Sequence, residues 1–131
     1  MTPSPRPWSK ADLALFDRAR EVLDQRYRPH RHTVAAALRT SRGKVYTGVC
    51  LDGLHSPCAE TIAFGSAVMD GDPTIQTIVA VSGKGVLSPC GNCRQMLIDY
   101  APEAEVLVQD GRRRLRVRAS DLLPFAFHTF G

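Results

Sequence analysis

The chain has 131 residues, of which 44% are hydrophobic and 23% charged, as in folded globular proteins rather than disordered ones. This length suits one domain and is too short for two. It contains no run of ~18 apolar residues and no charged start followed by an apolar stretch. Neither a membrane span nor a secretory signal is therefore indicated, and a cytoplasmic location is expected.

The chain begins with a proline-rich stretch that precedes a predicted helix. Residues 1–8 hold three prolines and are predicted to form a flexible tail, followed by a single domain over 9–131. Ser9 and Asp12, three residues apart, resemble a capping box and predict a helix start. Pro29 ends this helix. Its expected buried face consists of Leu13, Phe16, Ala19, Leu23 and Tyr27.

The remaining elements alternate between strands and helices. In chain order we expect a hairpin of strands 32–40 and 45–51, a buried helix 58–70, a buried strand 74–82, a loop 83–85, a helix from Cys90 to Pro102, short strands 105–109 and 115–117, and a helical turn at 121–124. This order predicts an α/β fold, a three-layer α/β/α sandwich around one mixed sheet.

The four cysteines indicate a metal site. In a chain expected to be cytoplasmic they are better explained as metal ligands or reactive thiols than as disulfides. Cys90 and Cys93 form one C-x-x-C pair, whereas Cys50 and Cys58 lie too far apart to form the second pair of a structural zinc ribbon. Cys50 is either a small buried residue at a strand end or part of a substrate pocket.

Cys58, Cys90 and Cys93 all fall at predicted helix starts. The N-terminus of a helix carries partial positive charge and unpaired N–H groups, which favour the thiolate that zinc requires. Cys90 and Cys93 are one helical turn apart, so with Cys58 they can form three corners of a tetrahedron whose fourth corner is left for water, as in catalytic zinc sites. Glu60 is near enough to act as general acid and base without binding the metal.

These two segments resemble a known signature. Cys58-Ala59-Glu60, with the Ser-Pro-Cys-Gly-Asn-Cys-Arg-Gln run at 88–95, is similar to the zinc signature of the cytidine deaminase superfamily. The longer run over 85–95 is most similar to its blasticidin-S deaminase branch, and residues 35–38 and 122–127 also resemble family segments. The resemblance implies a cytidine-deaminase-like fold and one Zn²⁺ per chain.

The resemblance also implies an activity. It predicts a zinc-dependent hydrolytic deaminase that replaces the exocyclic amino group of a small heterocycle, cytidine-like or blasticidin-like, by oxygen and releases ammonia. Glu60 would take a proton from the attacking water, protonate the adjacent ring nitrogen and later assist the departure of ammonia. The backbone around Ala59 and Ser88 would contact the ring. Small members of the family are usually homotetramers in which a C-terminal aromatic enters a neighbour's site, a role predicted for Phe127 and next for Phe125; a dimer is the alternative.

The sequence departs from the family where cytidine deaminases bind ribose. The usual Asn-x-Glu pair is Cys50-Leu51-Asp52 here, which removes hydrogen bonds and is expected to change selectivity. His32 stands in place of a stacking Phe, and Thr61 in place of an arginine. Arg31, Lys84 and Arg94 are cations that could offset the thiolate charge or meet an acidic substrate group, Lys84 being preferred; the alternative for each is an ordinary surface charge.

Two alternatives to a small-molecule enzyme are open. Arg112, Arg114, Arg116 and Arg118 alternate, so a strand would place them on one face, where they either track phosphates in a nucleic-acid-editing deaminase or protect an exposed edge strand from aggregation. The net charge of +4 permits anionic partners without requiring them, and no aromatic residues interleave with these arginines, so nucleic-acid binding is disfavoured. The second alternative is a non-catalytic zinc fold, for which Glu60→Gln would leave the biological role intact.

Overall fold

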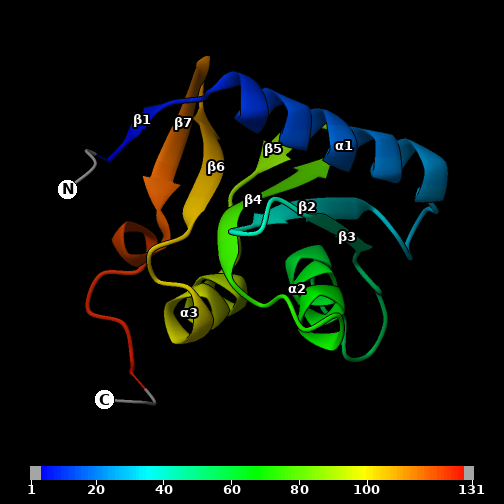
Figure 1. The fold of residues 1–131 in the computed structure, drawn as a ribbon. Coiled ribbons are helices and arrows are strands. Elements are labelled where there is room, and N and C mark those ends of the chain that lie inside the picture. The colour runs from blue at the N-terminus through cyan, green and yellow to red at the C-terminus, as the bar shows by residue number, and fades with distance from the viewer. Residues whose placement is uncertain (1–3, 129–131) are drawn as a thin grey trace.

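A computed structural model describes residues 4–128 as one mixed sheet with helices on both faces (Figure 1). The strands are β1 (Arg6–Pro7), β2 (Val34–Thr40), β3 (Val45–Val49), β4 (Ile75–Ser82), β5 (Gly85–Leu87), β6 (Glu105–Asp110) and β7 (Arg113–Arg118). The helices are α1 (Lys10–Arg26), α2 (Ala59–Met69), α3 (Gly91–Tyr100) and a short 3₁₀ helix, η1 (Ala119–Leu122). None of the helices in this part of the chain has the length and apolar character that crossing a membrane requires.

The sheet combines antiparallel and parallel pairs. Its strand order is β1-β7-β6-β4-β2-β3, with β5 paired to β4. The β4–β6 pair is parallel, and the other pairs are antiparallel. Helix α1 covers one face, and α2 and α3 cover the other (Figure 1). The predicted three-layer α/β fold with one mixed sheet is confirmed.

One strand differs from the sequence expectation. Residues after Ser82 were expected to form only a loop, but Gly85 adopts a φ of +111° that favours glycine, and the chain turns back as β5 to pair with β4. A strand of three residues is too short to produce a recognisable alternation. β5 leads the chain directly into α3.

Residues 6–8 are more ordered than expected. Residues 1–8 were predicted to be a flexible tail, yet Arg6 and Pro7 pair with β7, and the Trp8 ring lies 5.5 Å from the Phe16 ring. The Trp8 indole N–H donates to the Leu115 carbonyl over 3.1 Å. β7 is therefore not a fully exposed edge strand, because β1 pairs with it at Leu115 and Arg116.

Helix α1 begins where the capping box predicted. The Asp12 N–H donates to Ser9 Oγ over 3.2 Å, and the Ser9 N–H donates to Asp12 Oδ2 over 2.8 Å. The buried face is rotated from the expected one: Leu13 and Tyr27 are exposed. The face that contacts the sheet is formed by Leu15, Phe16, Ala19, Val22 and Leu23.

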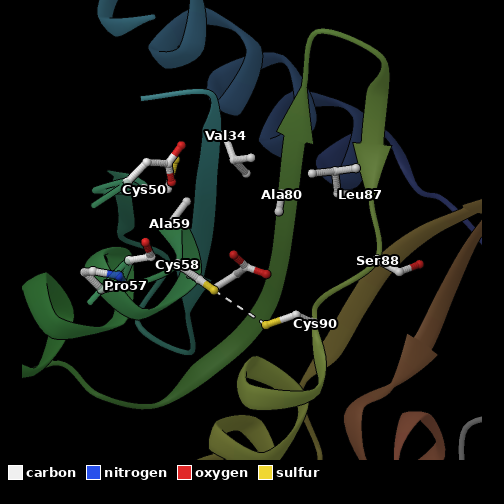
Figure 2. Close-up of a pocket in the computed structure, with 12 residues that line it drawn as sticks. Val34, Cys50, Pro57, Cys58, Ala59, Ala80, Leu87, Ser88 and Cys90 are labelled. Carbon is white, nitrogen blue, oxygen red and sulfur yellow. Dashed lines mark hydrogen bonds between the residues drawn. The ribbon is translucent and has the colours of Figure 1, made fainter. Parts of the chain in front are cut away.

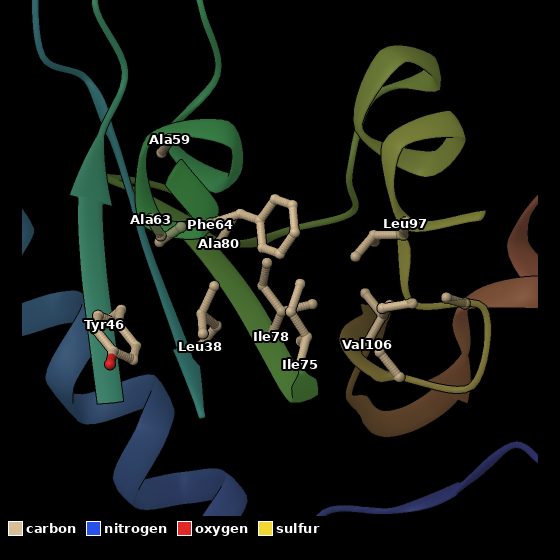
Figure 3. Packing of buried hydrophobic residues seen from close by; sticks show 14 of the residues in the cluster. Leu38, Tyr46, Ala59, Ala63, Phe64, Ile75, Ile78, Ala80, Leu97 and Val106 are labelled. Carbon is tan, nitrogen blue, oxygen red and sulfur yellow. The ribbon is translucent and has the colours of Figure 1, made fainter. Parts of the chain in front are cut away.

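The core lies on both faces of the sheet because successive side chains of β4 point to opposite faces. Ile78 and Ala80 belong to the cluster under α2 and α3 (Figure 3). Val79 and Val81 belong to the cluster under α1. Gly48 on β3 lets α2 approach closely, since an added Cβ would lie 2.6 Å from the Ala63 nitrogen and 2.8 Å from the Ala59 oxygen. This approach fixes the first turn of α2 against the sheet.

Candidate metal centre and substrate pocket

The N-termini of α2 and α3 bring three thiols together. Cys58 is the N-cap of α2, Cys90 is the N-cap of α3, and Cys93 lies in the first turn of α3. Their sulfurs all lie within 4.8 Å of one another, and the Cys58 and Cys90 sulfurs are 3.5 Å apart (Figure 2). Neither N-cap cysteine makes a side-chain capping bond, so both sulfurs are left to face the cluster.

This geometry fits a tetrahedral zinc ion. A Zn–S bond of about 2.3 Å implies S···S separations of roughly 3.8 Å around a tetrahedron, close to the spacing of these thiols. Thiolates are soft ligands of the kind zinc prefers. Within residues 4–128, no other group of three His, Cys, Asp or Glu side chains is arranged so that it could hold a metal.

The three thiols differ in how readily they ionise. Burial raises the pKa of Cys93 and of Cys58, whose neighbouring acidic groups add to the effect. Burial opposes ionisation of Cys90 as well, but backbone N–H groups of Cys93 and Asn92 and the Cys58 side chain outweigh it, so the pKa of Cys90 is lowered. Cys90 therefore ionises first, and metal binding by all three thiols releases protons.

Glu60 is a buried carboxyl beside the thiols. It lies in the first turn of α2 and is only 6% exposed. Burial raises its pKa, although backbone and Cys93 hydrogen bonds oppose the shift. A carboxyl whose pKa is moved toward neutrality can both accept and donate a proton at physiological pH.

Cys58, Cys90 and Glu60 line one cavity of about 190 Å³, whereas Cys93 is buried beside it. Val34, Ala80 and Leu87 contribute apolar walls, and Figure 2 shows Cys50 and Ser88 on opposite sides of the cavity. A metal centre, a buried carboxyl and a small apolar space thus share one site, as in pockets that bind a small flat molecule.

Comparison with known proteins accounts for this arrangement. Residues 9–109 match the model of the family described as the cytidine and deoxycytidylate deaminase zinc-binding region. The chain belongs to this family. The match confirms the resemblance and the zinc dependence predicted from the sequence.

Individual deaminases match over most of their length. The chain is 35% identical to blasticidin-S deaminase from Bacillus cereus, over 91% of this chain and 94% of that protein. It is 33% identical to a probable cytidine deaminase from Dictyostelium discoideum, over 86% of this chain and 80% of that protein. A crystal structure of cytidine deaminase from Burkholderia pseudomallei superposes with a TM-score of 0.75 at 33% identity, covering 92% of this chain and 100% of that one. The chain is a zinc-dependent deaminase.

Four residues predicted to contact substrate line the deaminase pocket. They are Cys50, Asp52, Ala59 and Ser88. Cys50 meets both sequence interpretations, because it is buried and also lines the pocket. Whether these residues bind substrate stays a prediction.

Thr33, which the sequence patterns do not single out, holds two of these residues in place. Its N–H donates to Cys50 Sγ over 3.3 Å, and its hydroxyl donates to Asp52 Oδ2 over 3.1 Å. The signal available was the hairpin register, since pairing of Ala35 with Val49 brings Thr33 beside the end of the next strand.

Other predicted residues lie outside the pocket lining. His32 Nδ1 is 2.9 Å from the Cys50 carbonyl oxygen, so its ring contacts the pocket's supporting strand. Lys84 instead lines a separate hollow beneath α1. Phe125 and Phe127 are exposed in the single chain, and the role predicted for them in a neighbouring chain stays a prediction.

The two remaining cations have structural partners. Arg94 donates to the Pro89 carbonyl over 2.8 Å and to the Leu122 carbonyl over 2.9 Å, which ties the segment before Cys90 to the C-terminal region. Arg31 donates to the Asp52 carbonyl over 3.1 Å. Both therefore support the pocket from outside it.

The arginines of β7 do not form a free stripe. Arg116 pairs with the buried Asp12 at 3.0 Å. Arg118 lies 3.6 Å from Glu103 and 3.9 Å from Asp121. Because these two side chains are engaged within the protein, neither a phosphate-tracking row nor an exposed protective edge describes them.

Proposed function

We propose that this deaminase hydrolyses the exocyclic amino group of a cytosine-type ring in a small nucleoside, forming a ring carbonyl and releasing ammonia. The observation that carries the proposal is the shared opening of Glu60, Cys58 and Cys90 onto one small apolar cavity, with the buried Cys93 completing the thiol cluster beside it. Its volume of about 190 Å³ is below the ~300–1,000 Å³ of pockets for drug-sized ligands, which favours a single ring over a nucleic-acid strand.

The proposed chemistry divides between the thiols and Glu60. Cys58, Cys90 and Cys93 would hold the zinc, which when bound supplies a Lewis acid that makes water nucleophilic at neutral pH. Glu60 would accept the proton of the attacking water and transfer it to the ring nitrogen beside the reacting carbon. It would then take the proton of the added hydroxyl group and pass it to the amino group, so that the C–N bond breaks, ammonia leaves and the ring carbonyl forms. One carboxyl thus serves as base and as acid.

The pocket walls would orient the ring. Val34, Ala80 and Leu87 supply apolar contacts for a flat heterocycle, while the backbone at Ala59 and the side of the pocket at Ser88 face its polar edge. Ala59 is fully buried, so its backbone position is fixed by the start of α2. A fixed ring keeps the reacting carbon beside Glu60.

The sugar end is where selectivity would be set. Cys50 and Asp52 each already accept a hydrogen bond from Thr33. Less hydrogen-bonding capacity is therefore left for ribose hydroxyls than an Asn-x-Glu pair would offer. We propose cytidine-like and blasticidin-like nucleosides as the substrate class. Turnover should depend less on an unmodified ribose than it would with an Asn-x-Glu pair.

A substrate panel tests the activity directly. Cytidine, deoxycytidine, cytosine and blasticidin S would be assayed for ammonia release with zinc-loaded enzyme, and we expect turnover of at least one nucleoside. Glu60→Gln should keep about one zinc per chain and lose turnover by roughly 10²–10⁴-fold. Absence of ammonia release from all four compounds would refute the substrate class. Normal turnover by Glu60→Gln would refute the role of that residue and favour the non-catalytic alternative.

We further propose a homo-oligomer, a tetramer or else a dimer, acting in the cytoplasm, where a reducing environment keeps ligand thiols reduced. The exposure of Phe125 and Phe127, at 107% and 74%, supports burial of this segment against another chain. Light scattering would give the mass. Phe127→Ala should raise KM if the ring reaches a neighbour's pocket, and an unchanged KM would exclude that contact.

A further inference from the structure

A second hollow, of about 360 Å³, lies beneath α1 on the side of the sheet away from the thiols. Helix α1 packs on this face against β2, β3 and β4, opposite α2 and α3 (Figure 1). The hollow is lined from α1, from the turn between β4 and β5, and from the turn between β6 and β7. It shares no lining residue with the deaminase pocket.

The lining of this hollow is basic. It includes Arg20, Lys84 and Arg114, and none of the residues that line it is acidic. Within residues 4–128 these three side chains make no ion pair or hydrogen bond, in contrast to Arg116 and Arg118 on the same strand as Arg114. Three cations without internal counter-charges therefore surround one concave space, where their fields add.

Aromatic rings hold two of these cations in position. The Arg114 guanidinium lies 4.9 Å from the Trp8 ring centroid and 5.0 Å from that of Phe16. The Arg20 guanidinium lies 5.8 Å from the Phe16 centroid. Cation–π contacts restrain a guanidinium while leaving its edge N–H groups able to donate, so less side-chain entropy is lost when an anion binds.

The backbone around the hollow also leaves room for a ligand. Gly85 and Gly111, at the two turns, have φ values of +111° and +62°. A Cβ added at either glycine would meet nothing within 4 Å. The turns can thus be approached closely by a bound group.

We propose that this hollow is a binding site for a small ligand that carries a di- or triphosphate. Two guanidinium forks match phosphate oxygens in bidentate fashion, and the Lys84 ammonium adds a third, compact charge. Several negative charges are needed to balance three cations, which favours a polyphosphate over a single carboxylate. The inference does not depend on the proposed deaminase substrate, because the two sites lie on opposite faces of the sheet.

Trp8 provides a local signal for the test, since it is the single tryptophan of the chain and contacts Arg114. Tripolyphosphate and a nucleoside triphosphate would be titrated into zinc-loaded protein at low salt while tryptophan fluorescence is recorded. Zinc content would be measured before and after, because polyphosphates can chelate metal. We expect a saturable change for both probes, with zinc retained.

Matched variants assign the signal to the hollow. Lys84→Gln and Arg20→Gln should each weaken binding by about tenfold or more, as loss of a charge-assisted contact does. Arg112→Gln removes the same charge from an exposed residue in the β6–β7 turn that does not line the hollow, and should change affinity less than about twofold. Glu60→Gln should bind as the wild type does, which separates this site from the deaminase site.

Several outcomes would overturn the proposal. Absence of a saturable change with either probe would do so. Equal weakening by Arg112→Gln and by the lining variants would show a diffuse surface charge rather than a site. Tighter binding of a single-stranded oligonucleotide that tripolyphosphate cannot displace would instead indicate a strand-binding surface.

Discussion

The three long helices of this deaminase begin in two different ways. The N-terminus of α1 is closed by a reciprocal capping box between Ser9 and Asp12. The N-termini of α2 and α3 begin instead at Cys58 and Cys90, which make no capping hydrogen bond. The same unpaired N–H groups are thus satisfied locally at one helix and left to stabilise thiolate at the other two. The first arrangement serves folding and the second serves chemistry.

The largest expected effect comes from replacing the zinc ligand Cys58, either by a residue that caps the helix or by one that does not. Asn is a strong N-cap but not a thiolate, and Cys58 already has the extended backbone of an N-cap residue, with φ −72° and ψ 156°. Cys58→Asn and Cys58→Ala should both lose zinc and reduce turnover by at least about 100-fold. Removing a zinc ligand costs more activity than removing a residue that only supports a ligand. Metal analysis and ammonia release measure both.

The same pair of variants isolates the capping cost. In the metal-free state Cys58→Asn should be more stable than Cys58→Ala by about 1 kcal/mol, measured by urea unfolding with chelator present. Equal stability of the two would show that the start of α2 does not need a cap. Full zinc retention by either would remove Cys58 from the ligand set.

The next largest effect is expected at the buried carboxylate of α1. Asp12 is 1% exposed, accepts from the Ser9 N–H and pairs with Arg116 at 3.0 Å. Asp12→Ala removes both interactions and should lower the free energy of unfolding by about 2–4 kcal/mol. Asp17→Ala, an exposed carboxylate on the same helix, should change it by less than about 0.5 kcal/mol. Turnover per folded molecule should be unchanged in both variants. Loss of zinc by Asp12→Ala would contradict the conclusion that the start of α1 serves folding and not the metal site.

Short-range patterns explain why the sequence predicts the metal centre well. Cys58, Cys90 and Cys93 lie within two short segments next to prolines and helix starts, so their local context carries the information. The long strands are likewise predicted because their apolar residues follow a recognisable period. Both features depend on neighbours within a few residues.

Features that depend on distant contacts were not predictable in this way. Lys84 is six residues before Cys90, but extended chain covers about 3.3 Å per residue, so β5 carries it to a different hollow. Pairing of Arg6 with Arg116 joins residues from opposite ends of the chain, and nothing in a proline-rich start indicates it. The partners of Thr33 depend on strand register in the same way.

A substitution at Gly48 would test how the sheet positions α2, a helix that begins at a cysteine. Gly48→Ala places a methyl group 2.6 Å from the Ala63 nitrogen, so α2 must shift, at a cost of about 1–3 kcal/mol. Because Cys58 and Glu60 are carried by this helix start, zinc affinity should fall as well. Gly65→Ala, on α2 with nothing within 4 Å, should be neutral or stabilise by about 0.5–1 kcal/mol with zinc affinity unchanged. A normal zinc affinity in Gly48→Ala would mean that the α2 start is not positioned by this contact.

The smallest expected effect is at the cap of α1. Ser9→Ala removes the acceptor of the Asp12 N–H but leaves the carboxylate that accepts from the residue 9 N–H, so half of the capping box survives. Unfolding free energy should fall by about 1 kcal/mol, and Ser9→Gly, which tolerates the N-cap conformation, by a few tenths. Zinc content and turnover should match the wild type, because α1 lies across the sheet from the thiols. A change in zinc affinity from this variant would show that the two faces of the sheet are coupled, and that the contrast between a folding helix start and a chemical one does not hold.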